Sequence, residues 1–210
     1  MGLDIKLFVI GPIENNTYLL SDSVAKEAVL IDPAAPSQDI QNYLNNNQYH
    51  LTQIWITHAH FDHIGGVNWF VEQSQDQLPV TVHPDALPLW ENAGGAHEFG
   101  FDFNPGMIPQ DLVQDGDMLT LGTSSFIVLH TPGHTPGHVT YYSANEGAAF
   151  CGDLIFYHGV GRTDLPGGNQ ATLINSINQK IFTLPDQTRL YPGHGRSTTV
   201  KEEKYNNPFL

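Results

Sequence analysis

Seven imidazole and carboxylate side chains form a pattern that constrains any fold this chain can adopt. They are His58, His60, Asp62, His63, His134, Asp153 and His194. Four of them lie within six residues, and the other three lie in separate segments further along the chain. Such groups are ligands for zinc, iron and manganese, and one ion rarely needs seven of them. The chain must therefore bring distant segments together, and the pattern predicts a centre with two adjacent metal ions.

The spacing inside the first cluster suits two ions. His58 and His60 lie two residues apart, so in an extended segment both side chains point the same way and can reach one ion. Asp62 and His63 follow where the chain begins to turn, which suits them to a second ion beside the first. Two ions about 4 Å apart can share and activate one hydroxide, so the cluster indicates a hydrolase.

Short apolar runs and turn residues predict an alternation of strands and helices. We expect strands at residues 5–10, 17–20, 28–31, 53–57, 80–82, 125–130, 139–143, 148–151 and 189–191, and helices at residues 38–47, 65–73, 85–91 and 171–183. The ligand candidates leave the C-terminal ends of predicted strands, where loops can gather into one site. Strand-rich halves separated by helices predict an α/β fold with sheets inside and helices outside. Residues 92–111, rich in glycine, proline and phenylalanine, are predicted to form a long excursion of a kind that is often functional.

The composition excludes several classes of function. Eight Lys and Arg against 22 Asp and Glu give a net charge of −14, whereas nucleic acids and anionic membrane surfaces are bound through clusters of basic residues. The single cysteine, Cys151, excludes an internal disulfide and a zinc site of several thiolates. No apolar run approaches the roughly 20 residues that span a bilayer, and residues 1–8 do not read as a signal peptide. We therefore expect a cytoplasmic protein with a small-molecule substrate and without nucleic-acid or membrane partners.

The segment His58-Ala59-His60-Phe61-Asp62-His63 matches the H-x-H-x-D-H signature of the metallo-β-lactamase superfamily, and the chain resembles this superfamily over essentially its whole length. It is most similar to the glyoxalase II branch, in particular to its short single-domain members. The resemblance implies an αββα sandwich, with two mixed sheets face to face and helices outside. It also implies the ligand sets, which are His58, His60 and His134 for one ion, Asp62, His63 and His194 for the other, and Asp153 as the bridge.

Two features set the chain apart from other members of the superfamily. True β-lactamases typically carry a cysteine where Asp153 stands, which argues against antibiotic hydrolysis. Full-length glyoxalase II adds a helical domain after its last metal histidine, whereas only fifteen residues follow Gly195 in this sequence. We therefore expect one domain over residues 1–210, without the helical domain that completes the glutathione pocket.

The resemblance and the leaving-group chemistry together predict a thioester hydrolase. Two divalent ions, zinc first and iron or manganese as alternatives, would make hydroxide available near neutral pH. Asp62 and Asp153 are the expected catalytic residues, Asp153 by helping to orient that hydroxide. A thiolate, with a parent pKa of about 8.5, leaves without a proton, whereas an amide nitrogen needs an acid that the sequence does not reveal. The predicted substrate is S-D-lactoylglutathione or another thiol conjugate.

Arg162 is the candidate contact for the substrate. In glyoxalase II the comparable loop carries a basic residue that contacts a carboxylate of glutathione, and Arg162 lies at a similar place within residues 158–168. A guanidinium can hold a carboxylate through two parallel hydrogen bonds. The alternative is a structural salt bridge between Arg162 and Asp164.

Other polar residues have structural interpretations beside functional ones. Asp32 is either a carboxylate that hydrogen-bonds to a ligand histidine or an ordinary turn residue. We expect His138 to be a hydrogen-bonded wall histidine, Cys151 to be a small buried residue, and His83 to cap or to pack. Spacing gives no partner to the remaining histidines, which are His50, His97, His130 and His158.

Two other functions are compatible with the same residues. A persulfide dioxygenase, whose members share a Gly-Arg-Thr-Asp segment like residues 161–164, would bind one Fe(II) through His58, His134 and Asp153. A non-catalytic, metal-dependent scaffold is the third interpretation, although the presence of all seven expected ligands argues against it.

Overall fold

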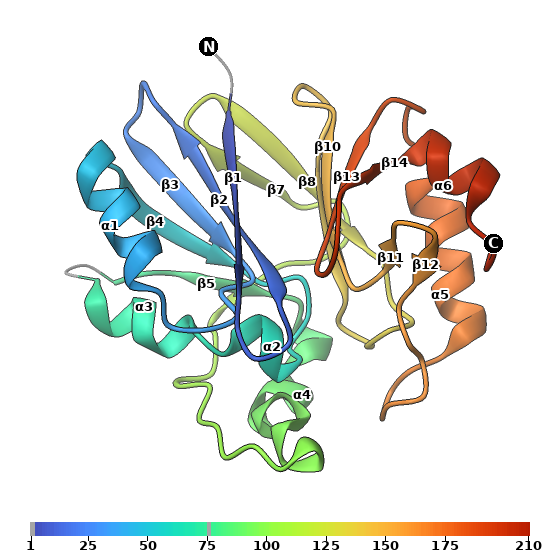
Figure 1. Ribbon diagram of the computed structural model, residues 1–210, viewed down its shortest axis with the longest axis horizontal. Helices are drawn as coiled ribbons and strands as arrows, with labels where there is room; N and C mark the ends of the chain where they lie inside the picture. The colour runs from blue at the N-terminus through green and yellow to red at the C-terminus, as the bar shows by residue number, and fades with distance from the viewer. Residues whose placement is uncertain (1–2, 75–76) are drawn as a thin grey trace.

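Over residues 3–74 and 77–210, which the computed structural model describes, the chain forms two six-stranded sheets packed face to face (Figure 1). The first sheet holds, in this order, β1 (Asp4–Ile10), β2 (Asn15–Asp22), β3 (Glu27–Ile31), β4 (His50–Trp55), β5 (Val80–Val82) and β6 (Asp111–Leu112). The second sheet holds, from edge to edge, β14 (Thr198–Thr199), β13 (Arg189–Pro192), β10 (Ala148–Gly152), β9 (Val139–Ser143), β8 (Ser124–His130) and β7 (Met118–Leu121).

Both sheets mix parallel and antiparallel pairs. In the first sheet, β1, β2 and β3 are antiparallel, and β3 to β6 are parallel. In the second sheet, β10 and β13 are parallel and the other pairs are antiparallel. Because β10 and β13 are parallel neighbours, the loops that follow them leave their sheet on the same side.

Large apolar side chains fill the space between the sheets. Trp55 of β4 packs against Phe126 of β8 and Tyr141 of β9, with ring centroids 5.0 and 5.3 Å apart. All three side chains are fully buried, and burial of such a side chain contributes roughly 1.5–3 kcal/mol. The hydroxyl of Tyr18 in β2 donates to the carbonyl of Pro192 at 2.7 Å. This bond ties the two sheets together at the end of β13, where the loop that carries His194 begins.

Helices cover the outer faces of both sheets (Figure 1). They are α1 (Gln38–Asn47) and α3 (Val67–Gln73) on the first sheet, and α5 (Gln170–Ser176) and α6 (Val200–Asn206) on the second. Ile40 of α1 and Phe70 of α3 belong to the same buried cluster as Leu30 of β3. Leu173 of α5 is buried with Leu190 of β13. The predicted αββα sandwich with two mixed sheets is confirmed.

The helix predicted at residues 38–47 has those bounds in the structure. The Ser37 hydroxyl accepts a hydrogen bond from the backbone N–H of Ile40 at 3.3 Å, which caps the start of α1. Gln48 has a left-handed backbone with φ 57°, which ends the helix. Ser37 is a cap residue that the sequence shows, whereas the backbone of Gln48 is seen only in the structure.

Several short elements were absent from the sequence-based expectation. Besides β6, β7, β14 and α6, they are α2 (Phe61–Ile64), β11 (Ile155–Phe156) and β12 (Gly159–Val160). Strands of two residues owe their existence to pairing with a neighbour rather than to their own sequence. The helix predicted at residues 85–91 is α4 (Leu87–Glu91), preceded by a helical turn at Pro84–Ala86.

Residues 92–111 are more regular than the predicted excursion. Ala93–Phe99 forms short helical turns that are interrupted at Gly94 and Gly95, and β6 pairs with β5. The helix predicted at residues 171–183 begins as α5, which ends at Ser176. It continues as a wider π-type turn at Ile177–Ile181. Across the described ranges, no helix combines the length and the apolar character needed to cross a membrane.

Candidate metal centre

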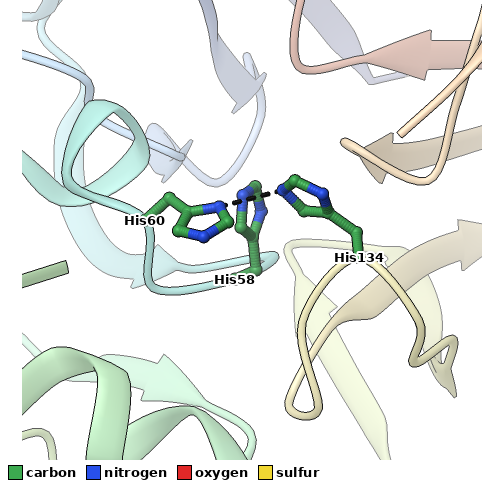
Figure 2. Close-up of side chains that lie close together, drawn as sticks. All are labelled: His58, His60 and His134. Atoms are coloured by element: carbon green, nitrogen blue, oxygen red, sulfur yellow. Dashed lines mark hydrogen bonds between the residues drawn. The ribbon is translucent and has the colours of Figure 1, made fainter. Parts of the chain in front are cut away.

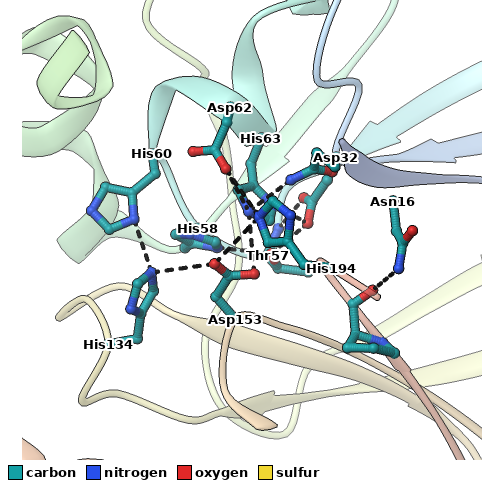
Figure 3. A network of polar contacts seen from close by, with 12 residues as sticks. Asn16, Asp32, Thr57, His58, His60, Asp62, His63, His134, Asp153 and His194 are labelled. Atoms are coloured by element: carbon teal, nitrogen blue, oxygen red, sulfur yellow. Dashed lines mark hydrogen bonds and ion pairs between the residues drawn. The ribbon is translucent and has the colours of Figure 1, made fainter. Parts of the chain in front are cut away.

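The seven ligand candidates come together around the ends of four strands, and their side chains point toward one another (Figure 3). His58 and His60 follow β4, and Asp62 and His63 lie in the short helix α2 directly after them. The other three leave the second sheet, where His134 follows β8, Asp153 follows β10 and His194 follows β13.

The first donor set consists of His58, His60 and His134, one ring nitrogen of each lying within 4.8 Å of the others (Figure 2). His134 Nδ1 lies 2.7 Å from the carbonyl oxygen of Arg162. A carbonyl only accepts, so His134 Nδ1 donates and its Nε2 carries the lone pair. This Nε2 lies 2.9 Å from His60 Nδ1. His58 Nε2 is buried without a hydrogen-bond partner among the described residues, and such an atom is costly unless an ion or water satisfies it.

Burial keeps these three imidazoles neutral. It lowers the pKa of His60 to about 3, and the neighbouring His134 adds to the effect. Burial also lowers the pKa of His58 far below its ordinary value, with a further contribution from His63. The pKa of His134 is lowered by burial as well. A metal ion binds the neutral imidazole, so the set is in its ligand form at neutral pH.

The second donor set consists of Asp62, His63 and His194, again with the donor atoms within 4.8 Å of one another. Asp62 Oδ2 lies 3.2 Å from His194 Nε2 and 3.6 Å from His63 Nε2. Burial opposes a charge on His63, but the carboxylates of Asp153, Asp62 and Asp32 outweigh it and raise the pKa of His63. This half of the centre therefore attracts positive charge, which a divalent ion supplies when it displaces these protons.

Asp153 lies between the two donor sets (Figure 3). Its Oδ2 is 3.8 Å from His134 Nε2 and 3.7 Å from His194 Nε2, and its Oδ1 is 3.4 Å from His63 Nε2. Within the part of the chain that the structure describes, Oδ1 has no hydrogen-bond partner. Nitrogen and oxygen donors that face one another across these distances suit a cation between them. The residues therefore fit divalent metal ions.

Asp32 holds the segment that carries the first ligands. Its carboxylate accepts hydrogen bonds from Thr57 N at 2.7 Å, from Thr57 Oγ1 at 2.6 Å and from His63 Nδ1 at 2.9 Å. The last bond places a proton on Nδ1, so Nε2, which faces Asp62 and Asp153, is the nitrogen available to a metal ion. Of the two interpretations of Asp32, the structure shows the hydrogen bond to a histidine that is a ligand candidate, His63.

Asn15 and Asn16, at the start of β2, belong to the centre although the sequence analysis did not select them. Asn16 donates from its backbone N–H to Gly193 O and from its side chain to Gly195 O, both at 2.7 Å. These bonds hold the loop around His194. Asn15 Nδ2 lies 2.9 Å from His63 Nε2, a contact that a metal ion at His63 would replace. The sequence signal for this role was that two polar residues, Asn15 and Asn16, begin an otherwise apolar strand.

Arg162 supports the centre through its backbone, because its carbonyl orients His134. Its guanidinium makes two 2.7 Å hydrogen bonds to the carboxylate of Asp164 and is 52% exposed. This is the structural salt bridge that was the alternative interpretation. A substrate carboxylate would have to take the place of Asp164.

The structure agrees with the expectations that His138 is a hydrogen-bonded histidine beside the donors and that Cys151 is a small buried residue. His138 Nδ1 lies 3.0 Å from Thr131 Oγ1, and the buried ring stacks on His58 with centroids 5.1 Å apart. Cys151 is fully buried, and burial raises the pKa of its thiol. A protonated buried thiol is a poor nucleophile.

For two of the histidines to which the sequence spacing assigned no partner, the structure shows a contact with a distant residue. His130 stacks on His83, with ring centroids 4.1 Å apart and planes 8° from parallel. His158 Nε2 lies 2.8 Å from Glu202 Oε1, a contact between the β11–β12 hairpin and α6. His83 accepts a hydrogen bond from the N–H of Asp85 and so caps the following turn, as expected.

Comparisons with known proteins agree with this geometry. A family model described as Metallo-beta-lactamase superfamily matches residues 10–194. The hydroxyacylglutathione hydrolase GloC of Haemophilus influenzae is 32% identical, over 99% of this chain and 98% of that protein. The structure of TTHA1623 in a di-iron-bound form is 38% identical, with a TM-score of 0.88 over 98% of this chain and 100% of that one. The structure of the BLEG-1 B3 metallo-beta-lactamase is also 38% identical, with a TM-score of 0.91 over 99% of both chains.

Proposed function

Since this chain belongs to the metallo-beta-lactamase superfamily, we propose that it is a two-metal hydrolase of thioesters, with S-D-lactoylglutathione as the substrate to test first. The observation that carries the proposal is Asp153, whose carboxylate faces both buried donor sets. The similarity to GloC, a hydroxyacylglutathione hydrolase, supports the choice of substrate class. A likeness at 32% identity supports a class of reaction better than an individual substrate.

The donor sets would each hold one ion, and Asp153 would contact both. Zinc suits the histidine-rich first set, while the di-iron form of TTHA1623 makes iron an alternative. When bound, two divalent ions lower the pKa of a water molecule toward neutrality and polarise a carbonyl group.

Asp62 and Asp153 are the carboxylates that would act on the attacking water. Burial opposes their ionisation, but His63 outweighs it and keeps the pKa of both carboxyls below the ordinary value. Both groups therefore remain acceptors at neutral pH. Asp153 would help to orient the attacking water, Asp62 would accept a hydrogen bond from it while staying ionised, and the proton that the water loses would pass to solvent.

The bond changes then favour a thioester. The water oxygen forms a bond to the carbonyl carbon, the carbon–sulfur bond breaks, and the sulfur leaves with the electron pair. A thiolate with a parent pKa of about 8.5 needs no proton at this step, so the reaction makes no demand for a general acid. Arg162 would contact a carboxylate of the thiol part once that carboxylate displaces Asp164.

The proposal is tested by hydrolysis of S-D-lactoylglutathione by protein loaded with zinc, iron or manganese, with metal content measured on the same samples. Asp153→Asn should abolish turnover, whereas Asp39→Asn, an exposed carboxylate in the first turn of α1, should not change it. Equal rates in the two variants, or no turnover by a protein that binds two ions, would refute the proposal.

Two parallel assays distinguish the other reactions of related proteins. Oxygen uptake with glutathione persulfide and one iron per chain would indicate the mononuclear dioxygenase, which uses only His58, His134 and Asp153. Cleavage of a β-lactam faster than of the thioester would indicate the activity named for BLEG-1. The completeness of the second donor set, with its atoms within 4.8 Å, favours the two-metal hydrolase over the single-iron enzyme.

A further inference from the structure

One turn of the chain lies directly on the loop that carries His60. Ala93, Gly94 and Gly95 all have left-handed backbones, with φ values of 50°, 61° and 74°. A Cβ atom at Gly94 would lie 2.7 Å from Phe61 Cα and 2.8 Å from the carbonyl oxygen of Ala59. Since these atoms belong to the two neighbours of His60, the turn is fixed beside the first donor set.

A recess of about 30 Å³ is lined by this turn and by His60. Its wall also includes Glu98 and Phe99, which follow the turn in the chain, and Leu165 and Pro166. Leu89 of α4 completes the apolar lining. Among the described residues, a larger cavity of about 420 Å³ lies between α3 and residues 105–111, but it borders none of the seven donors.

The aromatic wall of the recess is held in place although it is partly exposed. Phe99 is 47% and Phe101 is 43% exposed. Both rings pack against Phe61, with centroids 5.5 and 5.3 Å away. Phe61 lies between His60 and Asp62, so the wall and the ligand loop are packed as one unit.

The size of the recess limits what it can hold. One water needs about 10–15 Å³, so the recess takes two or three non-hydrogen atoms. Its lining is apolar except for Glu98, His60 and the amide of Asn92. Any group that enters must be short, and a negatively charged group would be repelled by Glu98.

We propose that this recess beside His60 is the subsite for the acyl group of the substrate, and that Leu89, Phe99 and Leu165 restrict it to short acyl chains. The inference rests on the proposed thioester hydrolysis and adds the residues that select the substrate. Glu98 excludes acyl groups that end in a carboxylate.

The test uses glutathione thioesters of increasing acyl length, namely acetyl, lactoyl, butyryl and hexanoyl, together with succinyl. For the metal-loaded wild type, we expect kcat/KM to fall at least tenfold from butyryl to hexanoyl, because an extra methylene in a filled pocket costs about tenfold or more. Leu89→Ala and Leu165→Ala should each raise the hexanoyl-to-acetyl ratio about tenfold. Leu7→Ala, at an exposed position on β1, is the matched control and should leave the ratio unchanged.

A second measurement does not depend on turnover. Calorimetric titration of the zinc-loaded protein with acetate, lactate, butyrate and hexanoate should give affinities in the same order as the kcat/KM values of the matching thioesters.

A variant of the charged residue tests the exclusion of carboxylates. Glu98→Gln should raise the succinyl-to-butyryl ratio of kcat/KM. Leu89→Val and Leu165→Val replace the alanine variants if those lose zinc or unfold.

The outcomes separate the two proposals. Cleavage of all thioesters with a flat length profile, or a profile that neither leucine variant changes, would overturn the assignment of the recess and leave the hydrolase intact. Failure of the metal-loaded wild type to cleave any thioester would overturn the proposed function, and the acyl subsite with it.

Discussion

Gly94 is a position where the addition of one methyl group should disturb the metal centre through its backbone. Gly94→Ala adds one methyl group, which would meet Phe61 Cα at 2.7 Å and Ala59 O at 2.8 Å. Carbon atoms pack best at about 3.5–4.0 Å, so the turn and the ligand loop must separate by about 1 Å. Both contacts are to backbone, so no flexible side chain can rotate away.

The loss of stability in Gly94→Ala has two parts, the cost of a left-handed backbone for alanine and the cost of the clash. A left-handed backbone costs an alanine roughly 1–2 kcal/mol relative to glycine, whatever its surroundings. Gly95→Ala carries this cost too, at φ 74°, but its Cβ would meet only Leu89 Cδ1 at 3.9 Å. The difference between the variants therefore measures the clash alone, for which overpacking contributes about 1–3 kcal/mol. A 1 Å misplacement of a catalytic group can lower kcat/KM about 100-fold.

Three measurements on both variants test this reasoning. They are the zinc affinity by competition with a chelator, the free energy of unfolding in urea, and kcat/KM for the best substrate. Gly94→Ala should bind zinc about 10–100-fold more weakly than Gly95→Ala, as is usual when the support of a ligand is disturbed. Equal zinc affinities and equal unfolding free energies in the two variants would show that the turn does not position the ligand loop.

Three further predictions concern the groups around the centre. Asp32→Asn should weaken zinc binding about 10–100-fold, since His63 Nδ1 loses its carboxylate acceptor; unchanged affinity in chelator competition would contradict the role of Asp32. In the metal-free protein, lowering the pH from 7 to 5 should cost about 2 kcal/mol through His60, because the unfolded chain takes up a proton near pH 6.5 and the folded pKa of His60 is about 3. His60→Gln should remove this part of the loss in urea unfolding, and an equally steep pH dependence in the variant would refute it. Arg162→Gln should raise KM for glutathione thioesters about tenfold, while Asp164→Asn should lower KM by freeing the guanidinium. A lower KM in Arg162→Gln together with a higher KM in Asp164→Asn would exclude Arg162 as the carboxylate contact.

The sequence alone determined the chemistry of the donors and the general architecture. The spacing from His58 to His63 and the later His134, Asp153 and His194 predicted which side chains the fold would have to gather, because ligand chemistry belongs to the residue type. The αββα sandwich followed from the resemblance, and the helix predicted at residues 38–47 has the bounds of α1. These features depend on residues that are neighbours in the chain or on motifs that recur intact.

Only the tertiary structure decided how the donors are supported and what surrounds them. The bond from Asp32 to His63 joins residues 31 positions apart, and the bonds from Asn16 to the His194 loop join residues almost 180 positions apart. The pairing of Arg162 with Asp164 was one of two open interpretations, and the contact of Gly94 with the ligand loop had no signature beyond a glycine pair. Such contacts are set by which strands pair and by how closely two backbones pass, and neither distance is written in the local sequence.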